Sequence, residues 1–283
     1  MTQFRQVTIV GLGLIGGSLG LALRRRHVAR RVVGVARRAA TAAQARRRGA
    51  VDRATVDLAG AVADADLVVI ATPPSTVVPL AAAVAGATTH ELIMTDAAST
   101  KAAIVQGWQR ALPSRIRVVG SHPLAGSEQS GLGAATAVLF DGALCVLTPT
   151  RQTSAEAVRR VQGLWRAVGM RTVTMSPARH DMVMAMISHT PHLVAASLVA
   201  ATTPAELAFA ATGFADTTRV ALGDPALWQD ICWTNRSAVL DALARVERAL
   251  VHLRQAIAYR DREELVKILA DSQRKRRRLT GRG

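Results

Sequence analysis

The sequence predicts an α/β fold: a Rossmann-type, doubly wound sheet in an N-terminal domain, followed by an all-helical C-terminal domain. Two observations predict it. Between residue 6 and about residue 176, short runs of Val, Ile and Leu alternate with helical stretches, as expected for parallel strands that helices cover on both faces. After Met175 the strand signals stop, and apolar residues recur at intervals of three and four. We therefore expect domains at residues 1–176 and 177–283.

Each predicted strand of the first domain is a short run rich in apolar residues. The seven strands are expected at Val7–Val10, Val32–Val35, Leu67–Ala71, Leu92–Thr95, Arg117–Gly120, Leu144–Leu147 and Thr172–Met175. The second domain is expected to start at Ser176-Pro177, because serine is a good N-cap and proline suits the first helical position. Asp224-Pro225 has the same pattern, and helical periodicity follows in Leu240, Leu243, Val246, Leu250 and Leu253, which step by three and four.

The composition is that of a globular protein, with 49% hydrophobic and 20% charged residues among 283. The formal net charge is +16, but nearly all the cations are arginines in an alanine-rich chain. Such a bias commonly reflects a GC-rich genome, so the charge is weak support for nucleic-acid binding. The basic run at 274–278 lacks interleaved aromatic residues and is interpreted as a solvated helix end. We expect no nucleic-acid partner.

Cysteine usage and apolar segments predict a cytoplasmic protein. Cys145 and Cys232 lie far apart, so neither a disulfide framework nor a metal cluster is indicated. The N-terminus lacks the pattern of a secretory signal. The longest apolar stretch, Met182–Ala201, contains His189 and His192 and is interpreted as buried helices, not as a membrane span.

The segment Gly11-x-Gly13-x-x-Gly16 lies between the first predicted strand and a helix start. In such a turn the first glycine permits the tight bend, the second leaves room for a pyrophosphate, and the third lets the helix pack closely on the strand. The helix N-terminus then offers free N–H groups to the phosphates. The motif is weak alone, but its context is the required one. We predict dinucleotide binding by Gly11, Gly13, Leu14, Ile15 and Gly16.

The end of the second predicted strand indicates which dinucleotide binds. An NAD site usually has Asp or Glu here for the ribose 2′-hydroxyl, whereas this chain has Ala36, Arg37 and Arg38. An arginine can pair with a 2′-phosphate through two hydrogen bonds. NADP is therefore favoured and NAD is the alternative, in which the arginines merely follow the composition. Thr72 and Pro73 are expected to line the cofactor or to form a simple strand-ending turn.

Four further motifs follow in order along the chain. They are Asp96-x-x-Ser99-x-Lys101, His122-Pro-x-x-Gly-Ser127-Glu128-x-Ser-Gly131, Ser188-His-x-Pro-His192, and Phe214-x-Asp-x-x-Arg219 before Asp224-Pro-x-x-Trp228. With the glycine turn, they resemble the prephenate/arogenate (cyclohexadienyl) dehydrogenases of tyrosine biosynthesis over nearly the whole length. The resemblance implies a Rossmann domain, a helical domain that forms a homodimer, and oxidative decarboxylation of a small cyclohexadienol to an aromatic product. No appended regulatory or mutase domain is expected.

The resemblance also implies residue roles. His122, expected just past a strand end, matches the catalytic histidine, and a neutral histidine is a natural proton acceptor near pH 7. Ser99 matches a serine that positions the nicotinamide and that histidine, although a helix N-cap is a competing role for it. Arg219 matches an arginine that binds a substrate carboxylate. His192 resembles a substrate-binding histidine.

The remaining motif residues have less defined roles. Ser127 and Glu128 are expected at the substrate, with Glu128 pairing with Arg219 or a histidine to gate the pocket. No metal site is indicated. Structural roles are considered for four more motif residues. His180 and His189 are expected to cap or bridge helices, Lys101 could equally be a surface charge, and Trp228 could belong to the core or to a pocket wall.

Three alternatives remain. A dehydrogenase of the β-hydroxyacid type would carry its lysine in a Gly-x-x-x-Lys helix, and Lys267 and Lys275 lack that glycine. A non-catalytic NADP-binding sensor need not keep His122, Ser99 and Arg219 together. Within the preferred family, the substrate is prephenate, arogenate, both, or an amino-substituted relative.

Overall fold

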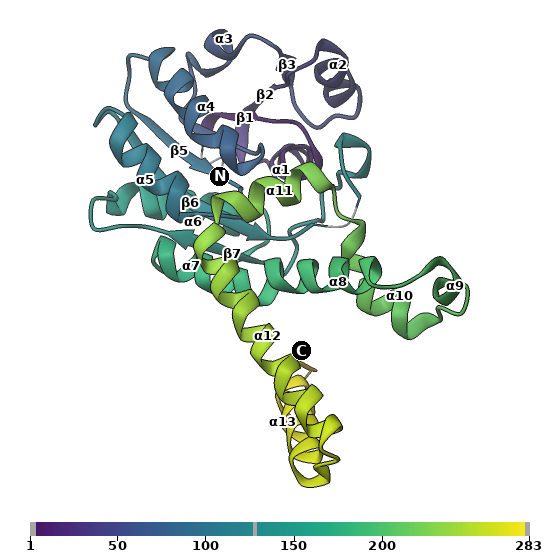
Figure 1. The fold of residues 1–283 in the computed structure, drawn as a ribbon. Helices are drawn as coiled ribbons and strands as arrows, with labels where there is room; N and C mark the ends of the chain where they lie inside the picture. The colour runs from purple at the N-terminus through teal and green to yellow at the C-terminus, as the bar shows by residue number, and fades with distance from the viewer. Residues whose placement is uncertain (1–3, 127–128, 281–283) are drawn as a thin grey trace. The chain divides into compact units, whose positions relative to one another are not determined.

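The structure, a computed structural model, describes residues 4–126 and 129–280 (Figure 1). Eight strands form one sheet in the order β3-β2-β1-β4-β5-β6-β7-β8. The first six positions follow the 3-2-1-4-5-6 strand order of doubly wound dinucleotide-binding folds, so the predicted fold class is confirmed. The strands are β1 (Phe4–Val10), β2 (Ala29–Val35), β3 (Arg53–Thr55), β4 (Leu67–Ile70), β5 (Leu92–Asp96), β6 (Ile116–Leu124), β7 (Leu144–Thr148) and β8 (Arg171–Thr174).

Strand direction changes once across this sheet. Neighbouring strands from β3 to β6 run parallel, β6 and β7 run antiparallel, and β7 and β8 run parallel again. All seven predicted strands are present, and β3 is the one that was not predicted. It is three residues long, lies at the edge of the sheet and has no buried residue, so it lacks the apolar run that marks the central strands.

Helices alternate with the strands in the first part of the chain and replace them after β8. The first group is α1 (Leu14–Arg25), α2 (Ala39–Arg47), α3 (Leu58–Val62), α4 (Pro74–Gly86), α5 (Ala102–Ala111), the short 3-10 helix η1 (Leu132–Ala134) and α6 (Ala155–Ala167). The second group is α7 (Pro177–Met184), the π-helix η2 (Ala185–His189), α8 (Thr190–Ala200), α9 (Pro204–Leu207), α10 (Thr212–Thr218), the 3-10 helix η3 (Arg219–Leu222), α11 (Pro225–Thr234), α12 (Arg236–Ala258) and α13 (Arg262–Thr280).

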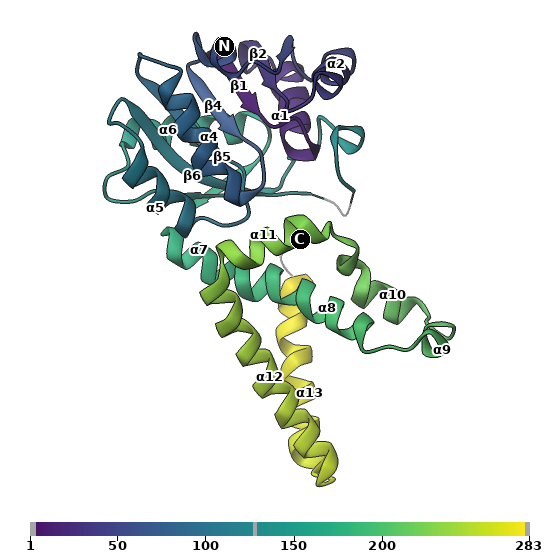
Figure 2. The ribbon, with the colours of Figure 1, turned by 45° about the horizontal axis from the view of Figure 1, so that its top comes forward.

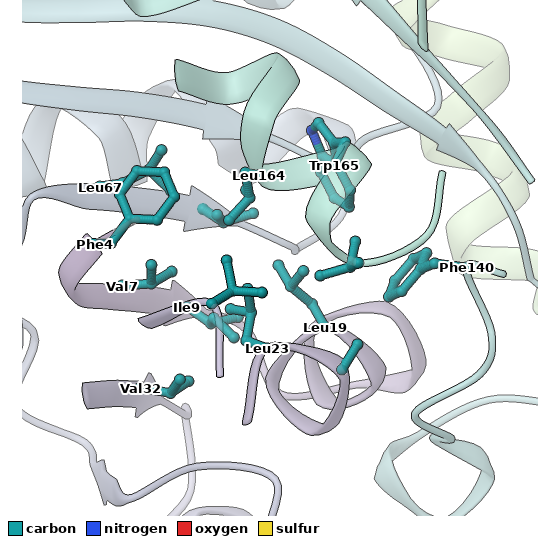
Figure 3. Packing of buried hydrophobic residues seen from close by; sticks show 14 of the residues in the cluster. Phe4, Val7, Ile9, Leu19, Leu23, Val32, Leu67, Phe140, Leu164 and Trp165 are labelled. Atoms are coloured by element: carbon teal, nitrogen blue, oxygen red, sulfur yellow. The ribbon is translucent and has the colours of Figure 1, made fainter. Parts of the chain in front are cut away.

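The core consists of two apolar clusters, one on each face of the sheet. Along β4, Leu67 and Val69 belong to one cluster, whereas Val68 and Ile70 belong to the other, because side chains alternate across a strand. Leu19 and Leu23 of α1 and Trp165 of α6 complete the first cluster (Figure 3). The second is completed by α4 and α5 through Val77, Val84, Ile104 and Trp108. Burial of each such side chain contributes about 1.5–3 kcal/mol, which fixes the strand ends that carry the candidate site.

The helical part begins where the sequence predicts. The Ser176 side chain accepts the backbone N–H of Arg179 at the start of α7, and Asp224 accepts that of Leu227 at the start of α11. The helices α7, η2 and α8 follow one another without a break (Figure 2), and a π-helical turn is frequently found at functional sites. By length and composition Pro177–Ala200 could cross a membrane, but core helices pass the same test, and this one carries buried histidines.

By contacts between residues, the chain divides into two compact units, one ending at Arg236 and one beginning at Ser237. The first contains the whole sheet and the helices through α11, and all candidate site residues belong to it. The second contains most of α12, together with α13, so the helical structure predicted from the periodicity of Leu240–Leu253 is confirmed. The predicted domain boundary at residue 176 stays a prediction.

Candidate active site

The glycine turn between β1 and α1 fits a dinucleotide phosphate. Gly11 has φ +99°, in the left-handed region, and a Cβ added there would lie 2.5 Å from the carbonyl oxygen of Ala71. A Cβ on Gly16 would overlap the carbonyl oxygen of Gly11. A Cβ on Gly13, by contrast, would meet no protein atom within 4 Å. The turn is therefore tightly packed at Gly11 and Gly16 and open at Gly13, where a pyrophosphate needs room.

The N-terminus of α1 is free to bind an anion. No side chain caps it, and its first turn contains no acidic residue, so the backbone N–H groups around Leu14 and Ile15 carry the positive end of the helix dipole uncompensated. Thr72 borders the turn, because its methyl group lies against Gly11. Pro73 is the N-cap residue of α4. These residues fit the phosphates of a dinucleotide cofactor.

The end of β2 presents two arginines beside that turn. Ala36 is buried, whereas Arg37 and Arg38 are exposed. Neither guanidinium group bonds to any other residue that the structure describes. Both are therefore available to an anionic group next to β2.

A fully buried ion pair lies at the end of β5. The Asp96 carboxylate pairs with the Lys101 ammonium group, and it also accepts the backbone N–H groups of Ala98 (3.0 Å) and Ser121 (3.1 Å). Burial raises the pKa of Asp96 and lowers the pKa of Lys101, while each charge opposes the shift of the other. The interpretation of Lys101 as a surface charge is wrong. The pair joins β5, β6 and the segment that precedes α5.

His122 lies inside β6, and the prediction that it lies just past a strand end is wrong. β6 pairs with β5 as far as Val119 and then with β7, where His122 is opposite Val146. The antiparallel neighbour supplies hydrogen-bonding partners beyond the end of β5, so the strand continues to Leu124. The His122 ring is held by the sheet, although part of its surface is exposed.

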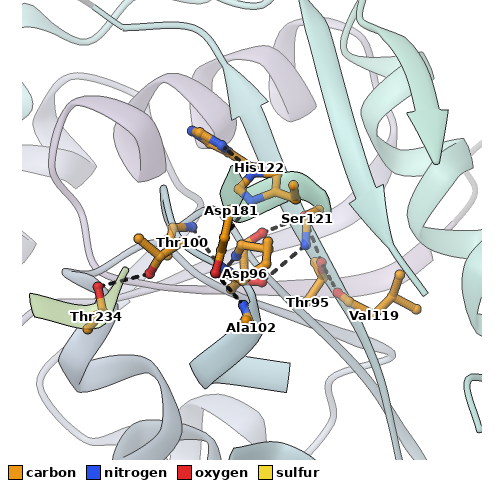
Figure 4. Close-up of polar contacts among 12 residues, drawn as sticks. Thr95, Asp96, Thr100, Ala102, Val119, Ser121, His122, Asp181 and Thr234 are labelled. Carbon is orange, nitrogen blue, oxygen red and sulfur yellow. Dashed lines mark hydrogen bonds and ion pairs between the residues drawn. The ribbon is translucent and has the colours of Figure 1, made fainter. Parts of the chain in front are cut away.

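His122, His180 and Asp181 form a chain of hydrogen bonds, in the region that Figure 4 shows around the labelled His122 and Asp181. Nδ1 of His122 lies 2.9 Å from Nε2 of His180, with the ring planes at 66°. Nδ1 of His180 lies 2.7 Å from Oδ1 of Asp181. His180 and Asp181 both lie in α7 and are buried. The chain of hydrogen bonds therefore runs from the partly exposed His122 into the protein interior.

Asp181 also binds the start of α5. Its two carboxylate oxygens accept the backbone N–H groups of Lys101 (2.7 Å) and Ala102 (2.8 Å). The N-cap residue of α5 is Lys101, so the alternative role of Ser99 as a helix N-cap is wrong. The first backbone N–H groups of a helix have no partner within the helix, and at the start of α5 the Asp181 carboxylate of α7 accepts them. Ser99 lies two residues earlier and is partly exposed.

Burial keeps the histidines neutral. The pKa of His122 is well below its usual value because of burial first, and then because of His180, Lys101 and His189. Burial lowers the pKa of His180, opposed by the hydrogen bond to Asp181. Burial lowers the pKa of His189 to about 4. At neutral pH each ring therefore has one donor nitrogen and one acceptor nitrogen.

The start of α8 presents polar atoms without partners. Among the described residues, His189 Nε2, Thr190 Oγ1 and His192 Nδ1 are buried and have no hydrogen-bond partner. The His192 ring stacks on Trp228, with centroids 3.5 Å apart, and Trp228 also meets the edge of His189. Buried polar atoms of this kind usually meet a ligand or water. His189 does bridge helices as predicted, because Nδ1 lies 3.2 Å from the Asn235 amide.

Arg219 begins a helix that packs against the helix of His192. It is the first residue of η3, which packs against α8, and the backbone of Val220 hydrogen-bonds to the His192 ring. The Arg219 side chain is exposed. Ser127 and Glu128 lie outside the described residues, so their predicted substrate roles stay predictions.

The glycine turn, Thr72 and Asp96 follow the carboxyl ends of parallel strands, which meet at one edge of the sheet. His122 joins them through Ser121 and Asp96. Among the residues of this network, the aspartates Asp96 and Asp181 and the amide of Asn235 were not predicted. Asp96 had a signal, because it stands in the motif of Ser99, and Asp181 had one, because it directly follows His180. Asn235 had none.

Two family models match the chain. One describes the nucleotide-binding domain of prephenate dehydrogenase and matches residues 19–174, and the other describes its dimerization domain and matches residues 176–271. Among curated proteins, a prephenate dehydrogenase from Bacillus subtilis is 38% identical over 94% of this chain and 74% of its own length. A cyclohexadienyl dehydrogenase from Zymomonas mobilis is 36% identical over 98% of this chain and 96% of its own length.

A solved structure is similar over the whole chain. It is a prephenate dehydrogenase from A. aeolicus in complex with hydroxyphenyl propionate and NAD+. The TM-score is 0.91 and the sequence identity 33%, and the match covers 97% of this chain and 98% of that one.

Proposed function

The chain belongs to the prephenate dehydrogenase family, and from this premise we propose that it oxidises and decarboxylates a cyclohexadienol, prephenate or arogenate, with a nicotinamide dinucleotide. The products are then 4-hydroxyphenylpyruvate or tyrosine, respectively. The single observation that carries the proposal is the partly exposed His122, hydrogen-bonded at Nδ1 to a buried His180–Asp181 pair.

The substrate dictates what the site must do. It carries a ring hydroxyl, a ring carboxylate and a side-chain carboxylate. The bond from carbon to hydrogen at the hydroxyl-bearing carbon breaks with its electron pair, and the bound nicotinamide supplies the hydride acceptor. The hydroxyl proton leaves to a base. The bond to the ring carboxylate then breaks, carbon dioxide departs, and the electron pair completes the aromatic ring.

His122 is the base in this proposal. Its pKa lies well below the usual value because of burial, so the ring is neutral at pH 7 and one of its nitrogens carries a lone pair. Nε2 is the ring nitrogen without a partner among the described residues, whereas Nδ1 is bonded to His180. The phenolate oxygen formed on loss of carbon dioxide takes the proton back, so His122 ends the cycle neutral. General-base catalysis of this kind contributes about 10²–10⁴-fold to a rate.

The cofactor side is proposed to prefer NADP over NAD. Ala36 leaves no acid at the end of β2, and the exposed guanidinium groups of Arg37 and Arg38 are available to a 2′-phosphate. Gly11, Gly13 and Gly16 are proposed to hold the pyrophosphate, with Thr72 and Pro73 beside it. Ser99 is proposed to contact the nicotinamide, because it lies between the end of β5 and the anchored start of α5.

The substrate carboxylates are proposed to bind between η3 and α8. Arg219 offers a planar guanidinium group for one carboxylate. The unpartnered Nδ1 of the buried His192 offers a second polar contact beside it. Ser127 and Glu128 remain proposed substrate contacts.

The dimerization-domain match over residues 176–271 supports a homodimer formed through the helical part. A cytoplasmic location is proposed with it. A non-catalytic NADP-binding sensor would not need His122 hydrogen-bonded to a buried His180–Asp181 pair. A dehydrogenase of the β-hydroxyacid type would carry the Gly-x-x-x-Lys motif, which Lys267 and Lys275 lack.

The proposal is tested by a steady-state assay of the full chain with prephenate and arogenate, each with NAD and with NADP. We expect at least one substrate to reach a kcat/KM within the enzymatic range of about 10⁴–10⁸ M⁻¹s⁻¹ with NADP. The appearance of the aromatic product is followed together with reduction of the cofactor. No turnover in all four combinations would contradict the proposal.

A further inference from the structure

The direction of the hydrogen bonds in the chain from Asp181 to His122 is fixed by its buried end. The Asp181 carboxylate already accepts the N–H groups of Lys101 and Ala102, and a carboxylate in that position can only accept. His180 Nδ1 must therefore donate to Asp181, which leaves His180 Nε2 as an acceptor in the neutral ring.

The same reasoning extends to the next ring. Because His180 Nε2 accepts, His122 Nδ1 must donate across the 2.9 Å contact. The neutral His122 ring then has its lone pair on Nε2, the nitrogen that faces no described partner. The hydrogen bonds that run from the start of α5 through Asp181 and His180 thus select the one tautomer of His122 that can accept a proton at Nε2.

We propose that His180 and Asp181 are positioning residues for the reaction, which set the tautomer of His122 and take up the positive charge that develops when His122 accepts the substrate proton. This inference rests on the proposed function. As the substrate O–H bond breaks, its proton bonds to His122 Nε2, and the Nδ1 proton of His122 moves to His180 Nε2. The cation then lies on His180, in contact with Asp181. Both transfers reverse when the phenolate oxygen takes its proton back.

The surroundings of His122 explain why such a relay is useful. Lys101 before α5, His180 on α7 and His189 on η2 act electrostatically on His122, and Cys145 on β7 contacts its backbone. Asp96 pairs with Lys101, and Asp181 bonds to His180. Lys101 and the two histidines disfavour a cation on His122. Asp181 is the carboxylate that reaches this chain directly, and it does so through His180. Aspartate that orients a catalytic histidine acts by the same physics in serine proteases.

Two variants of His180 separate the two roles. In His180→Gln the side-chain oxygen can accept from His122 Nδ1, so the tautomer is kept, but the amide cannot take up a proton. In His180→Leu both functions are lost. His90→Gln is the matched control, because His90 is exposed and also hydrogen-bonded, to Thr88 and Ala65.

The tautomer of His122 is measured by ¹⁵N NMR of the full chain with labelled histidine. The chain has seven histidines, and the His122 signals are assigned as those that a His122→Asn sample lacks. We expect the Nδ1–H form of His122 in the wild type, in His180→Gln and in His90→Gln. We expect the Nε2–H form or a mixture in His180→Leu and in Asp181→Asn, since an asparagine amide can donate to His180 and reverse the chain. An unchanged His122 tautomer in both of these variants would overturn the proposal.

Kinetics test the charge uptake. We expect kcat to fall about 10- to 100-fold in His180→Gln and further in His180→Leu, within the range of general acid–base effects, with the substrate KM nearly unchanged. A purely structural His180 would instead lower stability and raise KM with no change in the pH profile of kcat. If His180→Gln kept the kcat of the wild type, the proposal that His180 takes up the positive charge would be overturned. If no cyclohexadienol is turned over, the proposed function fails, while the NMR result still decides the tautomer.

Discussion

The backbone N–H of Lys101 donates a 2.7 Å hydrogen bond to the carboxylate of Asp181, 80 positions later in the chain. The same carboxylate bonds the His180 ring, so the start of α5 and the histidine chain share one anchor. Because Ser99 lies just before this helix start, the proposed nicotinamide contact and the proposed base are held in one hydrogen-bonded frame.

His122→Asn should lower kcat by about 10²–10⁴-fold, because asparagine cannot accept the proton. The cofactor dissociation constant should be nearly unchanged, since His122 is outside the glycine turn. Steady-state kinetics and a fluorescence titration with NADP measure the two quantities. His27→Asn is the control, because His27 is exposed and has φ +52°, which asparagine tolerates. Near-normal turnover of His122→Asn would exclude its role.

Gly13→Ala should weaken cofactor binding without destabilising the fold. A Cβ at Gly13 meets no protein atom within 4 Å, so the free energy of unfolding in urea should be unchanged. The same Cβ occupies space that the pyrophosphate needs, so the dissociation constant should rise by about tenfold or more, which is about 1.4 kcal/mol. Gly86→Ala, at an equally open position in α4, should leave cofactor binding unchanged and, because alanine favours a helix, should not lower the free energy of unfolding. Unaltered binding in Gly13→Ala would move the phosphate site elsewhere.

Arg37→Ala should reduce kcat/KM for NADP and leave that for NAD unchanged, because only NADP carries a 2′-phosphate. Hydrogen bonds to charged groups contribute about 1.5–3 kcal/mol, so a loss of roughly 10- to 100-fold is expected. Arg47→Ala, also exposed but on α2, controls for the loss of one positive charge. If the wild type uses NAD and NADP with equal efficiency, the interpretation of Ala36 and Arg37 is wrong.

Arg219→Ala should raise the substrate KM about 10- to 100-fold, because a carboxylate loses its charged partner. Arg219→Lys should recover part of the loss, since lysine keeps the charge but not the planar pair of donors. Initial rates over a range of substrate concentrations measure both variants, and the KM for the cofactor is the internal control. A KM unchanged in Arg219→Ala would place the substrate carboxylates away from η3.

Lys101→Met should destabilise the fold by about 3–5 kcal/mol, because it leaves the buried Asp96 carboxylate without its cation. Adding Asp96→Asn to this variant should restore part of that loss. Urea unfolding followed by circular dichroism measures the free energy of unfolding. The pair is a structural anchor of the site if both results are obtained, and equal stability of the wild type and Lys101→Met would disprove this.

The loss in Lys101→Met should also depend on pH. Burial raises the pKa of Asp96 in the folded state, and removal of Lys101 removes the charge that opposes this shift. A raised folded-state pKa stabilises the fold fully below the unfolded pKa, and this stabilisation is lost as the pH rises through the folded pKa. The deficit of the variant should therefore be largest near about pH 7 and shrink toward about pH 5. A deficit that is independent of pH would show that Asp96 does not carry it.

The sequence determined the sheet and the cofactor turn, because these depend on local patterns. Apolar runs of Val, Ile and Leu marked the central strands, whereas the short edge strands β3 and β8 have no buried residue. The N-caps Ser176 and Asp224 were readable because capping is a bond between near neighbours in the chain. The glycine spacing and the arginines after β2 likewise follow from positions within one strand, turn and helix.

Only the tertiary structure decided how the site residues are connected. Lys101 was open to interpretation as a surface charge until the fold placed it, fully buried, against Asp96. His122 lies inside β6 because β7 runs antiparallel beside it, and strand pairing is not encoded in β6 alone. Asp181 takes the capping role that was considered for Ser99, because α7 brings its carboxylate to the start of α5. Such contacts join residues distant in sequence, so their partners are fixed by packing and not by local pattern.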